Sequence, residues 1–186
     1  MLADSAARWL LVLHTGLGVA AVGAATHLFL WLWRGRAKPS TVRFAWLVVA
    51  LMLGAFIAGN VMYPTYKVEV RAAYLENPGA VSAAAAAHER ELARVAAREN
   101  ERPPEATQTI VLVHRAAQAA RWFDVKEHWV ALGLCAAIAL AFLLLVWDAA
   151  EGAAIRPVIL GLAGIVAGST WLAAIIGVMT AAWRAV

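Results

Sequence analysis

The sequence predicts an all-α, polytopic membrane protein. We expect four transmembrane helices in an up-down-up-down bundle, with an extramembrane helical hairpin between spans two and three. Of the 186 residues, 63% are hydrophobic and only 15% are charged, whereas a soluble domain is about half apolar and about a quarter charged. A span needs about 18 or more apolar residues. Four runs meet this requirement: residues 10–33, 44–62, 129–147 and 158–179.

The first span contains two of the five histidines, His14 and His27, and a series of small residues. Gly16, Ala20 and Gly23 recur at helical spacing, and His27 follows on the same face. Small side chains allow another helix, or a flat ligand, to approach the backbone closely. For the glycines taken alone, we favour plain helix packing.

The connection between spans one and two is strongly basic and contains no acid. Its charged residues are Arg34, Arg36, Lys38 and Arg43. Because cytoplasmic loops carry an excess of Lys and Arg, this loop is expected inside. Both termini and residues 63–128 then lie on the outer side, and the loop with Asp148 and Glu151 lies inside. The alanine- and arginine-rich composition suggests a bacterial inner membrane.

The second span has no ionisable residue and leads into the insertion at residues 63–128. Pro64 lacks a backbone donor, so we expect a kink or a new helix start there. Asn77-Pro78-Gly79 predicts a turn, and the alanine-rich, charged residues 80–102 predict a solvated helix. A second helix is expected to start near Glu105 and to run unbroken to Trp147, roughly 60 Å. Its first half would form the hairpin with residues 80–102.

The third span opens with the segment W-F-D-V-K-E-H-W, residues 122–129. Its ionisable residues are Asp124, Lys126, Glu127 and His128. Tryptophan and tyrosine favour the membrane–water boundary, so Trp122, Trp129 and Tyr63 are expected to be interfacial anchors. The charges have two interpretations. They form a binding site, or they pair with Lys67, Glu69 and Arg71 as an ionic girdle.

The fourth span repeats small residues at Gly161, Gly164 and Gly168, which predicts close helix packing. The single cysteine, Cys135, lies inside an apolar run of span three. It cannot form an intrachain disulfide, and we expect it to be a small buried residue.

His14 and His128 are the candidate haem ligands. Ionisable groups inside a membrane are costly and are functional candidates by default. In an up-down-up-down bundle, spans one and three lie on a diagonal, so histidines at similar depth could hold the iron of haem b between them. Lys67, Arg71 and Lys126 would then neutralise the propionates. In architecture and histidine placement alone, the chain resembles membrane b cytochromes.

His27 lies 13 residues beyond His14, about 20 Å deeper, and no histidine is present in the inner half of the other spans. We interpret it as a hydrogen-bonded packing residue, or as a group that binds quinone or handles protons. Asp124 and Glu127 complete the set of candidate site residues.

Three functions follow from these features. The first is a haem b electron-transfer subunit that passes electrons between a quinone and an outer partner, which makes it at most a subunit of an oxidoreductase. The second is a cofactor-free accessory subunit, and the third is a small transporter or metal-handling protein. The expected partners are the bilayer, proteins that bind the hairpin, and a second copy of the chain. No basic run indicates nucleic acid.

Overall fold

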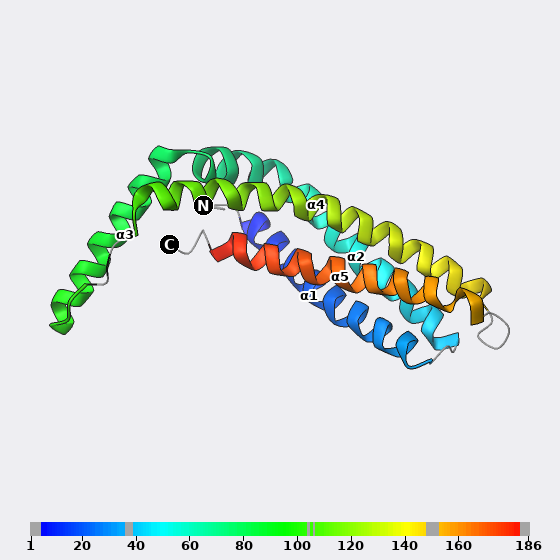
Figure 1. Ribbon diagram of the computed structural model, residues 1–186. Helices are drawn as coiled ribbons and strands as arrows, with labels where there is room; N and C mark the ends of the chain where they lie inside the picture. Colours follow the sequence, from blue (N-terminus) through cyan, green and yellow to red (C-terminus); the bar gives the residue numbers. More distant parts are fainter. Residues whose placement is uncertain (1–4, 36–38, 104, 106, 148–152, 183–186) are drawn as a thin grey trace. The chain divides into compact units, whose positions relative to one another are not determined.

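The structure, a computed structural model, describes residues 5–35, 39–103, 105, 107–147 and 153–182, which form helices joined by short turns and contain no strand (Figure 1). Arg36, Lys38, Asp148 and Glu151, which bear on the loop charges, lie outside these residues. The helices are α1 (Ser5–Trp33), α2 (Pro39–Thr65), the π-helical η1 (Tyr66–Leu75), α3 (Pro78–Glu99), α4 (Thr109–Val146), the short 3-10 helix η2 (Ala153–Ile155) and α5 (Arg156–Ala182).

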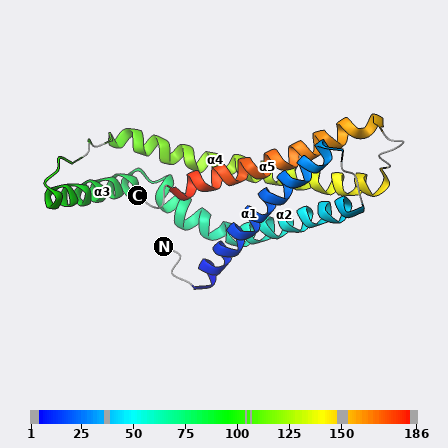
Figure 2. The same cartoon turned by 90° about the horizontal axis from the view of Figure 1, so that it is seen from below.

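Four of these helices are long and apolar enough to cross a membrane: α1, α2, α4 and α5 (Figure 2). They contain the four apolar runs of the sequence, which confirms the prediction of an integral membrane protein. The 38 residues of α4 form one unbroken helix. This also confirms that a single helix continues from the insertion into the third span, although it begins at Thr109 rather than near Glu105.

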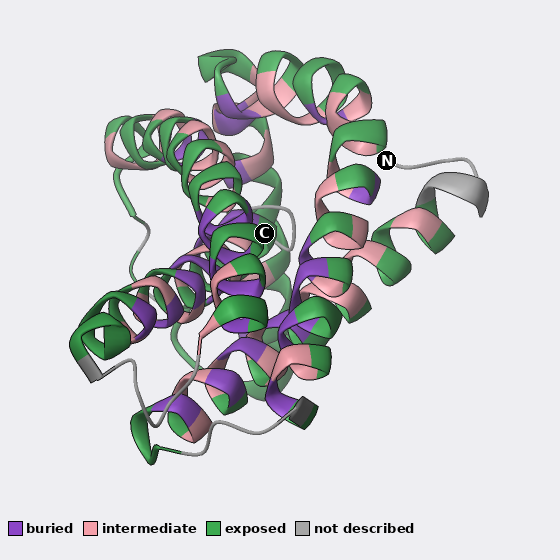
Figure 3. Ribbon diagram, turned by 90° about the vertical axis from the view of Figure 1, so that its right-hand side faces the viewer, coloured by how far each residue is buried: buried purple, intermediate pink, exposed green. Residues whose placement is uncertain are grey.

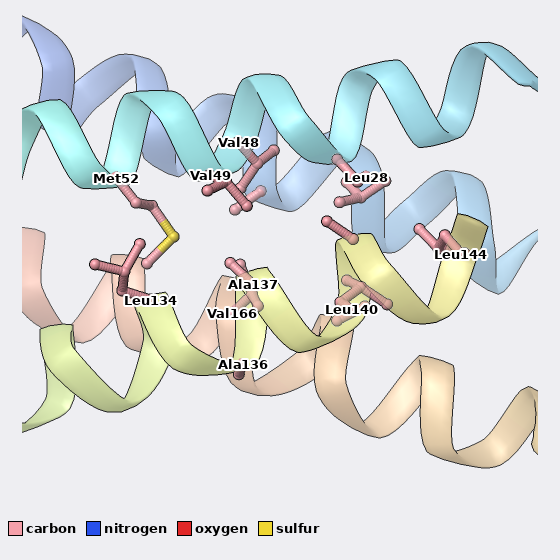
Figure 4. Close-up of a cluster of buried hydrophobic side chains, with 14 of the residues drawn as sticks. Leu28, Val48, Val49, Met52, Leu134, Ala136, Ala137, Leu140, Leu144 and Val166 are labelled. Atoms are coloured by element: carbon pink, nitrogen blue, oxygen red, sulfur yellow. The ribbon is translucent and has the colours of Figure 1, made fainter. Parts of the chain in front are cut away.

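The chain divides into two compact units, and the first contains residues 1–62 and 125–175. A single apolar core joins its four helices (Figure 3). The core centres on Leu28 of α1, Val48 of α2, Leu140 of α4 and Ile159 of α5, each exposed by 1% or less. Figure 4 shows Met52 of α2 and Leu134 of α4 pointing toward each other in this core.

Gly133 of α4, which the sequence analysis did not single out, lies where another helix approaches closely. A Cβ atom at this position would lie 2.6 Å from Cβ of Ser169 and 3.2 Å from Cε of Met52. By contrast, a Cβ at Gly16, Gly18, Gly23, Gly161 or Gly168 would meet nothing within 4 Å. Among the described residues, the expected packing of another helix at these glycines is therefore not found, and Gly164 is only in ordinary contact with Phe29.

Cys135 also differs from its expected position, because it is exposed rather than buried. Its neighbours Leu134 and Ala136 are both buried in the core. In an α-helix each residue turns about 100° from the last. One position in an apolar run can therefore face outward, and composition alone does not identify it.

The second unit contains residues 63–124 and 176–186, and it begins where α2 passes into η1. Pro64 lies inside α2 rather than at a break, and the backbone then widens to π-helical spacing over Tyr66–Leu75. The amide of Glu76 accordingly donates to the carbonyl of Arg71, five residues earlier, at 2.8 Å. A proline and a π-bulge both disturb the regular hydrogen-bond ladder, and the change of spacing begins two residues after Pro64.

The helix α3 confirms the predicted helix of the insertion, but it covers Pro78–Glu99 rather than residues 80–102. The Asn77 side chain accepts a hydrogen bond from the Ala80 amide at 3.1 Å, and Pro78 occupies the first turn, where its missing donor costs nothing. At the other end, Asn100 adopts the left-handed conformation with φ of 61°. A second apolar cluster joins η1, the start of α3 and the first half of α4 through Leu75, Val81, Ala116 and Ala120.

Candidate functional site

His14 of α1 is bonded to the backbone of α2. It lies half-buried on α1, and its Nδ1 donates a hydrogen bond to the carbonyl oxygen of Ala55 on α2 at 2.8 Å. A Cβ atom at Gly59 would lie only 3.1 Å from Cε1 of the ring. The absence of a side chain at Gly59 therefore lets the imidazole lie against the backbone of α2.

This hydrogen bond determines which ring nitrogen of His14 carries the proton. A carbonyl oxygen can only accept, so Nδ1 must be the donor. In the neutral ring, Nε2 then keeps its lone pair, and no described residue hydrogen-bonds to it. Anchoring one nitrogen on a backbone carbonyl and leaving the other basic is the arrangement that orients metal-ligating histidines.

Lys126 is the residue of the W-F-D-V-K-E-H-W segment that lies close to His14, near enough for the two to interact electrostatically. Lys126 and Glu127 are half-buried on α4, whereas His128 is exposed. His128 is two residues beyond Lys126, which places it about 200° around the helix. Lys126 is therefore within electrostatic range of His14, and helix geometry directs His128 to a different side of α4 from Lys126.

The charges outside the apolar runs form part of the expected ionic girdle. Arg71 of η1 bonds to Asp124 of α4 at 2.6 Å and to Glu76 at 2.8 Å. These bonds, that to Asp124 above all, raise the pKa of Arg71 above its ordinary value, so the guanidinium stays charged at any physiological pH. Arg71 thus has a structural partner of its own, while Lys67 and Glu69 are exposed on the same helix.

Three stacked rings lie beside this ion pair. The ring centroids of Tyr66 and Phe123 are 3.8 Å apart and nearly parallel, and Tyr63 stacks at 6.4 Å from each. Tyr66 is buried. Stacking at this range adds to the apolar contact between η1 and α4, so Tyr63 packs against protein as well as marking the end of the span.

His27 lies among aromatic rings rather than polar groups. Its ring centroid is 4.5 Å from that of Trp31 and 5.8 Å from that of Phe44, both in edge-on arrangements. These contacts favour the packing interpretation of His27. Trp122 and Trp129 are both more than 40% exposed, as expected for anchors, and the described residues contain no group of three or more His, Cys, Asp or Glu side chains that could hold a metal ion.

Ala55 and Gly59 are the functional neighbours that sequence reasoning missed. Only Gly59 could have been noticed in the sequence, because it is a glycine near the outer end of the second span that no turn or helix cap requires. Comparison with known proteins adds no further candidate, because no family model, no curated protein and no solved structure matches this chain.

Proposed function

We propose that the chain is a membrane-embedded haem b electron-transfer subunit in which His14 is an axial ligand. The observation that carries this proposal is the hydrogen bond from Nδ1 of His14 to the carbonyl of Ala55. It fixes the ring against α2 and directs the basic nitrogen away from the bond, as a ligand to iron requires. A bound haem b would supply one-electron chemistry, passing electrons between a quinone in the bilayer and a partner on the outer side.

The surroundings of His14 are suited to a large flat group. No residue from 8 to 20 on α1 or from 125 to 132 on α4 is buried. Gly18, one helical turn from His14 on the same face of α1, has open space at its Cβ position. Lys126, within electrostatic range of the ring, is a cation of the kind that binds propionate groups. Arg71 fits this role less well, because Asp124 and Glu76 already bind it.

The second axial ligand in this proposal is His128. It is less directly supported than His14, because it is exposed and lies about 200° around α4 from Lys126. For one haem to be held by both histidines, α4 would therefore have to rotate about its axis so that His128 faces His14. The experiment below separates the two ligands for this reason.

In the proposed topology, the four spans run up-down-up-down, and residues 63–128 form a helical hairpin on the outer side of a bacterial inner membrane. Two findings support this arrangement. Arg156 at the start of α5 donates a hydrogen bond to the carbonyl of Trp33 at the end of α1, at 3.0 Å. In an up-down-up-down bundle, the end of the first span and the start of the fourth lie at the same membrane surface. In addition, η1 and the start of α3 share an apolar cluster with the first half of α4.

The test is a reduced-minus-oxidised visible spectrum of the detergent-purified protein, expressed with added haem precursor. Three variants are compared: His14→Ala, His128→Ala and, as a matched control, His88→Ala, whose histidine is exposed on α3. We expect an α band of haem b in the unchanged protein and in His88→Ala, and its loss in His14→Ala.

Each result has a definite meaning. Loss of the band in both His14→Ala and His128→Ala would establish the pair. Loss in His14→Ala alone would keep the haem and assign the second position to another residue. An unchanged protein without any band, despite adequate haem, would rule out the electron-transfer function.

A second candidate function, a cofactor-free accessory subunit, is favoured by one observation. The glycines of α1 and α5 that have open space at their Cβ positions are free to receive another helix. If partner proteins or a second copy of the chain pack there, Gly18→Leu should dissociate the assembly in detergent, whereas Gly79→Leu, in the first turn of α3, should not. Size measurement by light scattering would distinguish these outcomes.

A further inference from the structure

A groove of about 260 Å³ lies between the first half of α4 and the last turns of α5. It belongs entirely to the second unit of the chain. Its lining residues are Arg115, Gln118, Ala119, Trp122, Met179 and Thr180. The volume is below the roughly 300–1,000 Å³ of pockets that enclose drug-sized ligands. A group the size of a lipid headgroup is therefore a more suitable occupant than a whole cofactor.

Three hydrogen-bond donors line one wall of this groove. Arg115, Gln118 and Trp122 recur at helical spacing on one face of α4, and each is exposed. None of the three forms an ion pair or hydrogen bond with a described residue. The hydroxyl of Thr180 donates to the carbonyl of Ile176 at 2.7 Å and is therefore occupied. With no acid in the lining, the groove suits an anion.

The order of the lining residues along α4 matches the order of groups in a phospholipid. Arg115 is seven residues before Trp122, so it lies about 10 Å farther from the apolar run that begins at Trp129. Trp122 and Met179 lie at the end of the groove nearer the apolar runs of α4 and α5. The charged donor thus lies where a phosphate would be, and the indole and thioether lie where glycerol and acyl chains begin.

We propose that this groove binds the headgroup of an anionic phospholipid, with Arg115 on the phosphate and Trp122 against the glycerol region. Arginine presents a planar fork of donors that matches phosphate oxygens and is the usual residue for this contact. Binding would fix how deeply α4 and α5 are inserted in the bilayer, relative to the phosphate groups of the outer surface. This proposal depends only on the protein being in a membrane and is independent of the haem.

The test measures lipid binding to the full chain in nonionic detergent by native mass spectrometry. Dioctanoyl phosphatidylglycerol is compared with dioctanoyl phosphatidylcholine, on the unchanged protein and on Arg115→Gln. The matched control is Arg121→Gln, which removes the same charge from an exposed position on the same helix outside the groove. Because both arginines are exposed, both variants should keep the elution volume and melting temperature of the unchanged protein.

We expect phosphatidylglycerol to bind the unchanged protein more tightly than phosphatidylcholine. Arg115→Gln should weaken the binding of phosphatidylglycerol about tenfold, as the loss of a charge-assisted hydrogen bond implies, and Arg121→Gln should weaken it less than about twofold. Equal weakening in the two variants, or equal binding of the two lipids, would overturn the proposal. A third arm adds glycerol phosphate as competitor, and competition at the same concentration as the lipid would assign the groove to soluble phosphate compounds instead.

Discussion

The two halves of the four-helix unit are packed very differently. In the half that contains Leu28, Val48, Leu140 and Ile159, apolar side chains from all four helices are buried against one another. In the half around His14, α1 has no buried residue between positions 8 and 20, and α2 has only Ala58 between positions 53 and 62. The same helices thus form a dense core at one level and bury few side chains at another.

This difference shows which half determines the fold and which is available for function. Close packing stabilises a bundle in lipid through many small dispersion contacts, since apolar surface gains little by leaving acyl chains. A half without such contacts adds little to stability and is free to hold a cofactor or a partner. His14 lies in the open half, and its one strong contact there is with a backbone carbonyl rather than with a packed side chain.

The largest effect is expected from truncating the packed half. Leu140 is 0% exposed, so Leu140→Ala leaves a cavity that its neighbours only partly fill, and should cost about 2–5 kcal/mol of unfolding free energy. The matched control is Leu13→Ala in the open half, where the side chain is 53% exposed and the cost should stay below about 0.5 kcal/mol. Thermal unfolding in detergent measures both. Similar losses in the two variants would contradict the comparison.

An intermediate effect is expected from adding one methyl group to each half. Gly133→Ala places a Cβ against Ser169, and overpacking of this kind should cost about 1–3 kcal/mol. Gly16→Ala adds the same methyl group where nothing lies within 4 Å, and alanine is the better helix former. This variant should therefore unfold at an unchanged or higher temperature. Destabilisation by Gly16→Ala would show that the open half is packed in the membrane.

A smaller effect is expected from the ion pair of the second unit. Arg71 and Asp124 are 22% and 41% exposed, so solvent screens their bond, and a double-mutant cycle of Arg71→Gln and Asp124→Asn should give a coupling of about 1 kcal/mol or less. The pKa of Arg71 is raised, so its contribution is complete below the ordinary arginine pKa and is lost only above it. The arginine should therefore add no pH dependence near neutrality, which unfolding at several pH values would check.

The sequence was sufficient for features that depend on neighbouring residues. Four apolar runs predicted four membrane helices, and the alanine-rich residues 80–102 predicted the helix that the structure has as α3, Pro78–Glu99. These predictions succeed because a span needs length and apolarity, and a solvated helix needs residues of high helix propensity. The up-down order of the spans and the helical hairpin remain predictions.

Features that depend on which helix faces meet could not be predicted. Gly16 and Gly133 look alike in the sequence, yet only Gly133 lies against another helix. Cys135 lies in an apolar run and still faces outward. The sequence analysis considered an ionic girdle at this level, but it did not identify Arg71 and Asp124, which are 53 positions apart, as the pair that forms.

The smallest expected effect concerns Gly59 and the tautomer of His14. Gly59→Ala would place a Cβ 3.1 Å from Cε1 of the ring, so the ring must move by a few tenths of an ångström and the bond to Ala55 should lengthen. The cost in stability should be below about 0.5 kcal/mol, because this half is loosely packed. Nitrogen-15 chemical shifts of labelled histidine, assigned with His14→Asn, report the change directly. The unchanged protein should show the proton on Nδ1, and Gly59→Ala should show a mixture of tautomers. A proton on Nε2 in the unchanged protein would contradict the bond to Ala55 and remove the strongest support for His14 as a ligand.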